Sequence, residues 1–298
     1  MLPMTKPQHL IDLHTHSTCS DGTLTPTELM ERAHQLGLHT IALTDHDTLD
    51  GIGEAQAAAE RLDLRLITGV EISTIFGSGE FAGKEFHILG LDLDETNTDL
   101  LNAFETLRNF RAQRNEDMLA AFHAHGIPLD RGDLYATANG ENLTKAHFAR
   151  LLIRRGYAEH FDDAFGRFLS PGCPTHVDKR CLEPKQAIEL INQGGGVAIL
   201  AHPYRYRLSD NQLVDLAAEL TALGLGGIEA IYNNHLPDQE IFLRAVADEN
   251  KLVISGGTDF HGANKAGIQL GSGRGNMQIP LRVWENIRDY KEKRGKAC

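Results

Sequence analysis

Acidic and imidazole side chains recur in five short clusters along this chain. The clusters are Asp12-Leu13-His14-Thr15-His16, Thr44-Asp45-His46-Asp47, Gly69-Val70-Glu71, Ala201-His202-Pro203 and Asp259-Phe260-His261. Each cluster ends a short apolar run, and imidazole combined with carboxylate suits manganese, iron or zinc. Several such ions on shared carboxylates can activate water for the hydrolysis of phosphate esters. The chain therefore contains the donors of a polynuclear metal site.

The spacing within the clusters indicates which side chains can bind one ion. His14 and His16 are two residues apart, so on a strand both imidazoles point to the same face. Asp259 and His261 repeat this spacing. A carboxylate can bridge two metals more readily than an imidazole can, and Glu71 is therefore the predicted bridging ligand.

The second cluster cannot bind one ion with all of its members, because adjacent residues on a strand point to opposite sides. His46 is the predicted ligand there. Asp45 or Asp47 could orient an imidazole or act in proton transfer, and the sequence leaves both roles open.

Three further ligand candidates have weaker local signals. Asp21 follows in the loop that begins at His16, although its Asp-Gly sequence is also a common turn. His87 begins an apolar strand, where an ordinary strand histidine is the alternative. His202 precedes Pro203, and proline favours an extended conformation at the residue before it.

Basic residues could bind a phosphate near this site. Lys145, His147 and Arg150 lie on one predicted helix, and a helix N-terminus with such side chains can clamp a phosphate. A solvated helix face is the competing interpretation. Arg205, which follows His202 closely, is a similar candidate.

The elements that must position these residues alternate between strand and helix. Strands are predicted at 9–14, 39–43, 65–70 and 85–93, with helices at 25–37 and 53–62, and this rhythm is typical of parallel strands with crossover helices. Helices at 99–126, 142–156 and 161–169 interrupt the rhythm. The alternation resumes with helices at 184–193, 210–223 and 237–250 and strands at 197–201, 227–231 and 253–256. We expect a metal-binding barrel formed by residues 9–94 and 181–290, with a helical insertion at 95–180 that contributes to substrate binding.

Composition limits the partners of this 298-residue chain. Its net charge of −12 argues against a long duplex nucleic acid and favours small phosphorylated molecules or short strands. No stretch approaches the roughly 20 apolar residues of a membrane span. The first residues have no apolar core of a signal peptide, so the expected location is cytoplasmic. The four cysteines form no Cys-x-x-Cys pair and are expected to be reduced. The expected oligomeric state is a monomer.

The five clusters together resemble those of the PHP (polymerase and histidinol phosphatase) superfamily. Two further features are similar to the branch that contains nucleoside 3′,5′-bisphosphate phosphatases and 5′-to-3′ exoribonucleases. Asp21 stands where many PHP proteins have another His, and Thr-Lys-Ala-His-Phe-Ala-Arg at 144–150 resembles the inserted substrate segment of this branch. The resemblance implies a distorted (β/α)7 barrel with two or three metals, commonly manganese, with iron, zinc or magnesium as alternatives. It implies that the first metal is bound by His14, His16, Glu71 and Asp259, the second by Glu71, His87 and His202, and the third by Asp21, His46 and His261.

The resemblance also implies an activity. We expect a metal-dependent phosphoesterase that removes the 3′-phosphate of nucleoside 3′,5′-bisphosphates and degrades short 5′-phosphorylated RNA in the 5′-to-3′ direction. A metal-bridging hydroxide would attack phosphorus, with Asp45, Asp47, Glu71 and His202 as the catalytic candidates and Lys145, His147, Arg150 and Arg205 as the substrate contacts. The alternatives are a histidinol-phosphate phosphatase, a metal-dependent amidohydrolase, and a metal-stabilised interaction module without catalytic activity.

Overall fold

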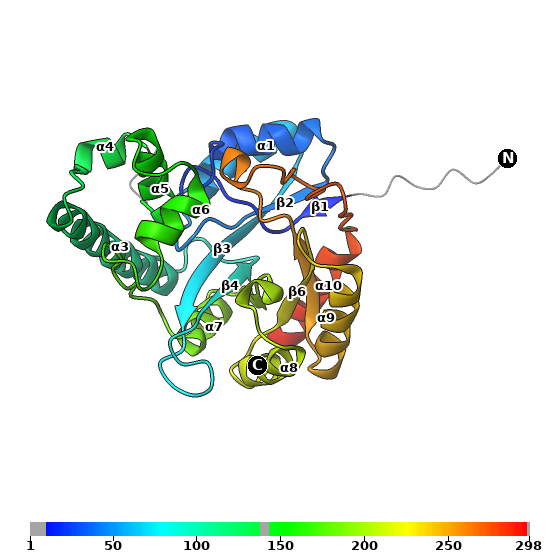
Figure 1. The fold of residues 1–298 in the computed structure, drawn as a ribbon. Helices are drawn as coiled ribbons and strands as arrows, with labels where there is room; N and C mark the ends of the chain where they lie inside the picture. The colour runs from blue at the N-terminus through cyan, green and yellow to red at the C-terminus, as the bar shows by residue number, and fades with distance from the viewer. Residues whose placement is uncertain (1–9, 138–142, 297–298) are drawn as a thin grey trace.

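Seven strands form one sheet whose order follows the chain. The computed structural model describes residues 10–137 and 143–296, so the predicted starts at His9 and Asn142 lie outside the described residues. The strands are β1 (Ile11–Asp12), β2 (Thr40–Leu43), β3 (Arg65–Ile75), β4 (Glu85–Leu91), β5 (Val197–Leu200), β6 (Gly227–Tyr232) and β7 (Val253–Gly257). The amide of Leu13 donates to the carbonyl of Gly256 over 3.2 Å, which joins the first strand to the last. The sheet is therefore nearly closed, and the expected distorted barrel is confirmed (Figure 1).

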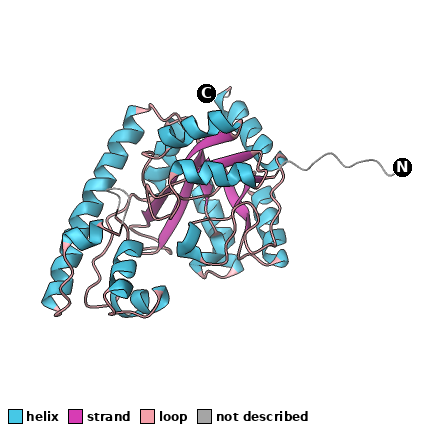
Figure 2. Ribbon diagram, turned by 90° about the horizontal axis from the view of Figure 1, so that it is seen from above, coloured by secondary structure: helices cyan, strands magenta, loops and turns pink. Residues whose placement is uncertain are grey.

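Helices surround the sheet, as Figure 2 shows from above. They are α1 (Pro26–Gln35), α2 (Ile52–Leu62), α7 (Pro184–Gln193), α8 (Asp210–Ala222), α9 (Pro237–Glu249) and α10 (Arg282–Gly295). Thr25 caps α1 and forms a capping box with Glu28, and Pro26 occupies the first turn as predicted. The sequence reading did not identify α10, whose Trp284 and Ile287 pack on apolar side chains of the strands.

The direction of β4 differs from the prediction. The strands were expected to be parallel, but β4 is antiparallel to both β3 and β5. Because β4 runs in the opposite direction, its first residues lie at the same edge as the last residues of its neighbours. His87 stands opposite Ser73 of β3 in this register. A histidine near the start of β4 can therefore reach the same mouth of the barrel as residues that follow the other strands.

The helices expected between residues 95 and 180 are present and gather on one side of the barrel in Figure 1. They are α3 (Thr98–Ala124), α4 (Arg131–Tyr135), α5 (Lys145–Arg154), α6 (Phe161–Ala164) and the π-helical turn η1 (Phe165–Leu169). These helices share an apolar cluster that contains Phe122, Phe148 and Leu151 and is separate from the clusters around the sheet. The helices thus pack on one another, and the first half of α3 also packs on the barrel core through Leu100, Phe104 and Leu107. The domain boundaries stay a prediction.

Candidate metal centre

The predicted ligands meet at one mouth of the barrel. His14 and His16 follow β1, His46 follows β2, and Asp259 follows β7. Glu71 differs, because β3 continues past it to Ile75 instead of ending there. A bridge between His46 and Glu71, in which the amide of Asp47 donates to the Glu71 carbonyl over 3.0 Å, draws the second cluster against β3. Segments far apart in the sequence therefore present their polar side chains to one point.

The first donor group consists of His14, His16, Glu71 and Asp259, and all four side chains are buried. The Nε2 atoms of His14 and His16 lie 3.3 and 3.2 Å from Glu71 Oε2. The same two nitrogens lie 3.6 and 3.5 Å from Asp259 Oδ1. Two imidazoles and two carboxylates thus converge on a space of the size that one ion would occupy.

The second donor group consists of His46, Glu71 and His87. His46 Nδ1 lies 3.2 Å from Glu71 Oε2, and His87 Nδ1 lies 2.7 Å from Glu71 Oε1. His202 Nε2 also approaches Oε1, at 2.8 Å. The resemblance assigned His87 and His202 to one metal with Glu71, and both imidazoles contact the same carboxylate oxygen. Glu71 lies at the centre of the site and contacts five imidazoles.

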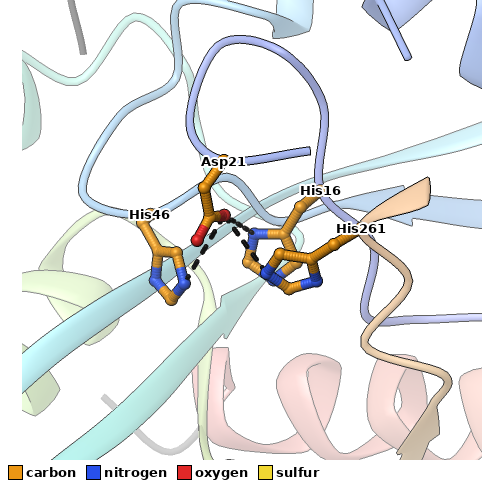
Figure 3. A group of neighbouring side chains, drawn as sticks. All are labelled: His16, Asp21, His46 and His261. Carbon is orange, nitrogen blue, oxygen red and sulfur yellow. Dashed lines mark ion pairs between the residues drawn. The ribbon is translucent and has the colours of Figure 1, made fainter. Parts of the chain in front are cut away.

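The third donor group consists of His16, Asp21, His46 and His261, shown in Figure 3. Asp21 Oδ1 lies 3.1 Å from Nε2 of His261 and 3.9 Å from Nε2 of His46. His16 belongs to this group as well, since its Nδ1 lies 3.9 Å from the same oxygen. The resemblance placed His16 on the first metal alone, whereas its ring lies between the first and third groups.

The chemistry of these groups fits divalent cations. The buried Nε2 atoms of His14 and His16 and the Oε2 atom of Glu71 have no hydrogen-bond partner among the described residues. A buried polar atom without a partner costs about 1–3 kcal/mol, and a metal ion would satisfy several of these atoms together. The mixed donors suit manganese, iron or zinc. The observed side chains therefore fit the two or three ions expected from the sequence.

Burial and neighbouring charges set the ionisation of these groups. Burial lowers the pKa of His202 and of His46 to about 3, so both imidazoles are neutral at pH 7. Neutral imidazole is the form that binds a metal. Burial alone would raise the pKa of Glu71, but the positive charges of the nearby imidazoles His87 and His14 outweigh it and hold that pKa well below its ordinary value. The shared carboxylate is thus ionised, as a ligand must be.

Two of the donors have a backbone conformation that is unusual for residues other than glycine. His202 has a φ of 31° and Asp259 a φ of 54°, both in the left-handed region. The prediction that Pro203 would hold His202 extended is therefore wrong. The carboxylate of Glu229 accepts the amide N–H of His202 over 2.8 Å, which helps to stabilise this turn. Strained backbone of this kind persists where the surrounding structure fixes it, and it is frequent at functional sites.

Glu229 is a functional candidate that the sequence reading missed. It lies inside β6, fully buried, and His14 Nδ1 lies 3.0 Å from its Oε1. A carboxylate on the second ring nitrogen fixes the tautomer and orientation of a metal-binding histidine. The one feature of the sequence that could have indicated Glu229 is its position as an acidic residue within the otherwise apolar strand β6.

Replacing Glu229 with Gln is expected to weaken manganese binding by about 10- to 100-fold, since the amide keeps the shape but loses the charge that orients His14. Titration of the metal-free protein with manganese, followed by calorimetry, measures this. Glu219→Gln, on the solvent side of α8, is the matched control. Unchanged affinity in the Glu229 variant would contradict the positioning role.

The structure places Asp45 and Asp47 beside the donor groups, with partners of their own. Asp45 accepts the amide of Ser17 over 2.8 Å and the hydroxyl of Ser20 over 2.5 Å. It therefore stabilises the loop that carries Asp21. Asp47 pairs with Arg111 and accepts the amide of Ser73 over 3.0 Å. These contacts suit positioning residues, and the roles of Asp45 and Asp47 stay predictions.

Two cavities of about 380 Å³ each adjoin the donor groups and share His46, His87 and Arg205. One, which we call the cationic cavity, is lined by Arg111, Arg114, Lys145 and Lys179. The other, which we call the aromatic cavity, is lined by Phe161, Phe165, Asn264 and Lys265. Of the cations in the cationic cavity, the sequence identified Lys145 and Arg205. It did not identify Arg111 and Arg114, which lie within the long helix α3.

The predicted phosphate contacts are placed differently from one another. Lys145 lines the cationic cavity and Arg205 lines both cavities, where its Nη1 lies 3.0 Å from Asp259 Oδ2. His147 is buried, and its Nδ1 accepts the amide of Thr144 over 3.0 Å as part of the helix cap. Arg150 donates to the Thr137 carbonyl over 2.9 Å. Of the four predicted phosphate contacts, Lys145 and Arg205 therefore line a cavity among the described residues, whereas His147 and Arg150 are not in either lining.

Comparison with known proteins agrees with this geometry. The family model of the PHP domain matches residues 12–170. The chain belongs to the PHP family. It is 39% identical to a 5′-3′ exoribonuclease of Haemophilus influenzae over 93% of this chain and 98% of the relative. It is 34% identical to a 3′,5′-nucleoside bisphosphate phosphatase of Chromobacterium violaceum over 93% of this chain and 96% of the relative.

A solved structure shows the same arrangement of the chain in space. An amidohydrolase from Chromobacterium violaceum, with bound sulfate and no metal, superposes with a TM-score of 0.83 at 32% identity, covering 94% of this chain and 96% of that one. As a PHP protein with these relatives, the chain is a metal-dependent hydrolase. Within the described residues, none of the helices has the length and apolar character needed to cross a membrane.

Proposed function

We propose that this PHP protein removes the 3′-phosphate of nucleoside 3′,5′-bisphosphates and cleaves short 5′-phosphorylated RNA from its 5′ end. The observation that carries the proposal is the cationic cavity beside the donor groups. A phosphate at the donor groups leaves room for a second anionic group near Lys145 and Arg114. A bisphosphate and a 5′-phosphorylated strand both carry a second phosphate close to the phosphorus that reacts.

The metals and the protein side chains would have different roles in the reaction. Two or three divalent cations, with manganese as our first choice, would supply an activated water and neutralise the phosphoryl oxygens. Glu71 and His202 would hold these cations from β3 and from the turn after β5. Lys145 and Arg205 would bind phosphate oxygens through charge-assisted hydrogen bonds. In RNA cleavage, the 5′-phosphate would occupy the cationic cavity while the next phosphodiester lies at the donor groups.

The cavity lining and the names of the two sequence relatives support this proposal over its alternatives. A histidinol-phosphate phosphatase would bind a cationic amino alcohol. The lining of the cationic cavity has more cations than carboxylates, even with Glu85 and Asp21 counted, and this excess disfavours such a group. Carbon-centred amide hydrolysis would use the same donors without a need for the cationic cavity. Both relatives described above are named for nucleotide or RNA substrates.

Manganese-loaded protein is expected to release phosphate from adenosine 3′,5′-bisphosphate and mononucleotides from a short 5′-phosphorylated RNA, and to leave histidinol phosphate intact. The His202→Ala variant should lose both activities, because this imidazole contacts the shared carboxylate Glu71 at 2.8 Å. Phosphate release and gel analysis of the RNA measure the two reactions. Turnover of histidinol phosphate alone would overturn the substrate assignment, and inactivity towards all three with metals bound would overturn the phosphoesterase proposal.

A further inference from the structure

Two phenylalanines stand in the wall of the aromatic cavity and have no part in the proposed phosphate chemistry. Phe161 of α6 and Phe165 of η1 are four residues apart, which places them on one face of the helical segment. Both rings are partly exposed and line the same cavity as Glu71 and His202. Phe165 lines the cationic cavity as well. Apolar ring surface is therefore available beside the donor groups and beside the predicted phosphate contacts.

The surrounding structure holds this aromatic segment in place. The amide of Ser170 donates to the Phe165 carbonyl over 3.0 Å, which closes the wide π-helical turn. Turns of this type often occur at functional sites. Both phenylalanines also pack against the apolar cluster of the insertion. Ala146 of α5 lines both cavities beside Phe165, and its side chain is a single methyl group.

We propose that Phe161 and Phe165 form a stacking platform for the nucleobase of the substrate. The proposal rests on the proposed function, since a nucleotide bound by its phosphates must place its base within reach of these cavity walls. A planar base gains by stacking on aromatic rings whatever its identity. Such a platform would let one site bind nucleotides with different bases, and it predicts tighter binding of purines, which offer the larger ring surface.

The test compares a ligand that carries a base with one that does not. The probes are adenosine 5′-monophosphate and ribose 5-phosphate, and calorimetry measures the dissociation constant of each with manganese-loaded protein. Phe165→Leu keeps an apolar side chain for packing but removes the ring, and Phe165→Tyr restores the ring. Phe168→Leu is the matched control, because Phe168 lies on the same turn, packs against the same cluster and is absent from the described linings of both cavities.

In Phe165→Leu, the dissociation constant of adenosine 5′-monophosphate is expected to rise about tenfold while that of ribose 5-phosphate stays unchanged. Phe165→Tyr and Phe168→Leu should both bind as the unmodified protein does. Equal weakening of both probes, or no weakening of either, would overturn the platform. A base-dependent loss of affinity in a protein that does not hydrolyse nucleotides would keep the platform and overturn the proposed reaction. If the protein hydrolyses nucleotides but binds adenosine 5′-monophosphate no more tightly than ribose 5-phosphate, the proposed reaction stands and the platform is overturned.

Discussion

Replacing Glu71 with Gln is expected to lower kcat for adenosine 3′,5′-bisphosphate by about 1000-fold and to remove manganese from two of the three donor groups. Both the first and the second group depend on this carboxylate, which contacts His14, His16, His46, His87 and His202. Loss of metal-based stabilisation of a phosphoryl transition state costs several kcal/mol, and each 1.4 kcal/mol is a factor of ten in rate.

The pattern of metal loss makes this prediction specific. The third group does not contain Glu71, so Glu71→Gln should retain manganese there, as measured by elemental analysis after dialysis. Asp21→Asn is expected to give the complementary pattern, with loss from the third group only. Asp92→Asn, which disrupts a surface pair with Lys291 on the barrel, is the control for general damage. Full metal content and full activity in Glu71→Gln would refute the role of Glu71 as the shared ligand.

Most of the donor groups could be predicted because their signals are local. His14 and His16, like Asp259 and His261, follow short apolar strands, and the spacing of two is visible in the sequence. Parallel strands then bring their carboxyl ends to one edge without further information. The assignment of donors to individual ions is different, because it depends on ring orientations such as that of His16 between two groups.

Three features could not be predicted from the sequence because they depend on long-range contacts: the direction of β4, the role of Glu229 and the backbone conformation of His202. The direction of β4 follows from its pairing with β3 and β5, and a single apolar run looks the same in either direction. Glu229 gains its role only when the barrel closes and brings it to His14 and His202. The left-handed φ of His202 occurs together with that contact and departs from the local preference before proline.

The sequence also did not predict that Arg111 and Arg114 line the cationic cavity, because their position depends on long-range packing. Arg111 and Arg114 occur in a helix that also carries Arg108, and the sequence gives no indication of which guanidinium faces the barrel. In the structure Arg111 and Arg114 are buried and line the cavity, whereas Arg108 pairs with Asp50 at the surface. Packing of α3 against the barrel thus converts an ordinary helical charge pattern into part of the candidate substrate site.

Lys145→Ala is expected to raise KM for adenosine 3′,5′-bisphosphate by about 10- to 100-fold and to leave KM for methyl phosphate within about twofold. A hydrogen bond to a charged group contributes about 1.5–3 kcal/mol, and methyl phosphate has no second phosphate to gain it. Steady-state kinetics with both substrates measures the difference. Lys185→Ala, at an exposed position of α7, is the matched control. A parallel rise for both substrates would place Lys145 at the reacting phosphate instead of the second one.

The pH dependence of kcat/KM tests the contact between Lys145 and the second phosphate without removing the side chain. Burial, together with the charge of Arg114, lowers the pKa of Lys145 to about 8, against the opposing charge of Glu85. Lys145 therefore carries its charge below that pH and loses it above, so kcat/KM for the bisphosphate should fall above about pH 8. Lys145→Arg keeps its charge throughout this range and should remove that part of the decline. An identical decline in both proteins would show that the second phosphate does not depend on the charge of Lys145, and the cationic cavity would then lose its main argument as the site that selects bisphosphates.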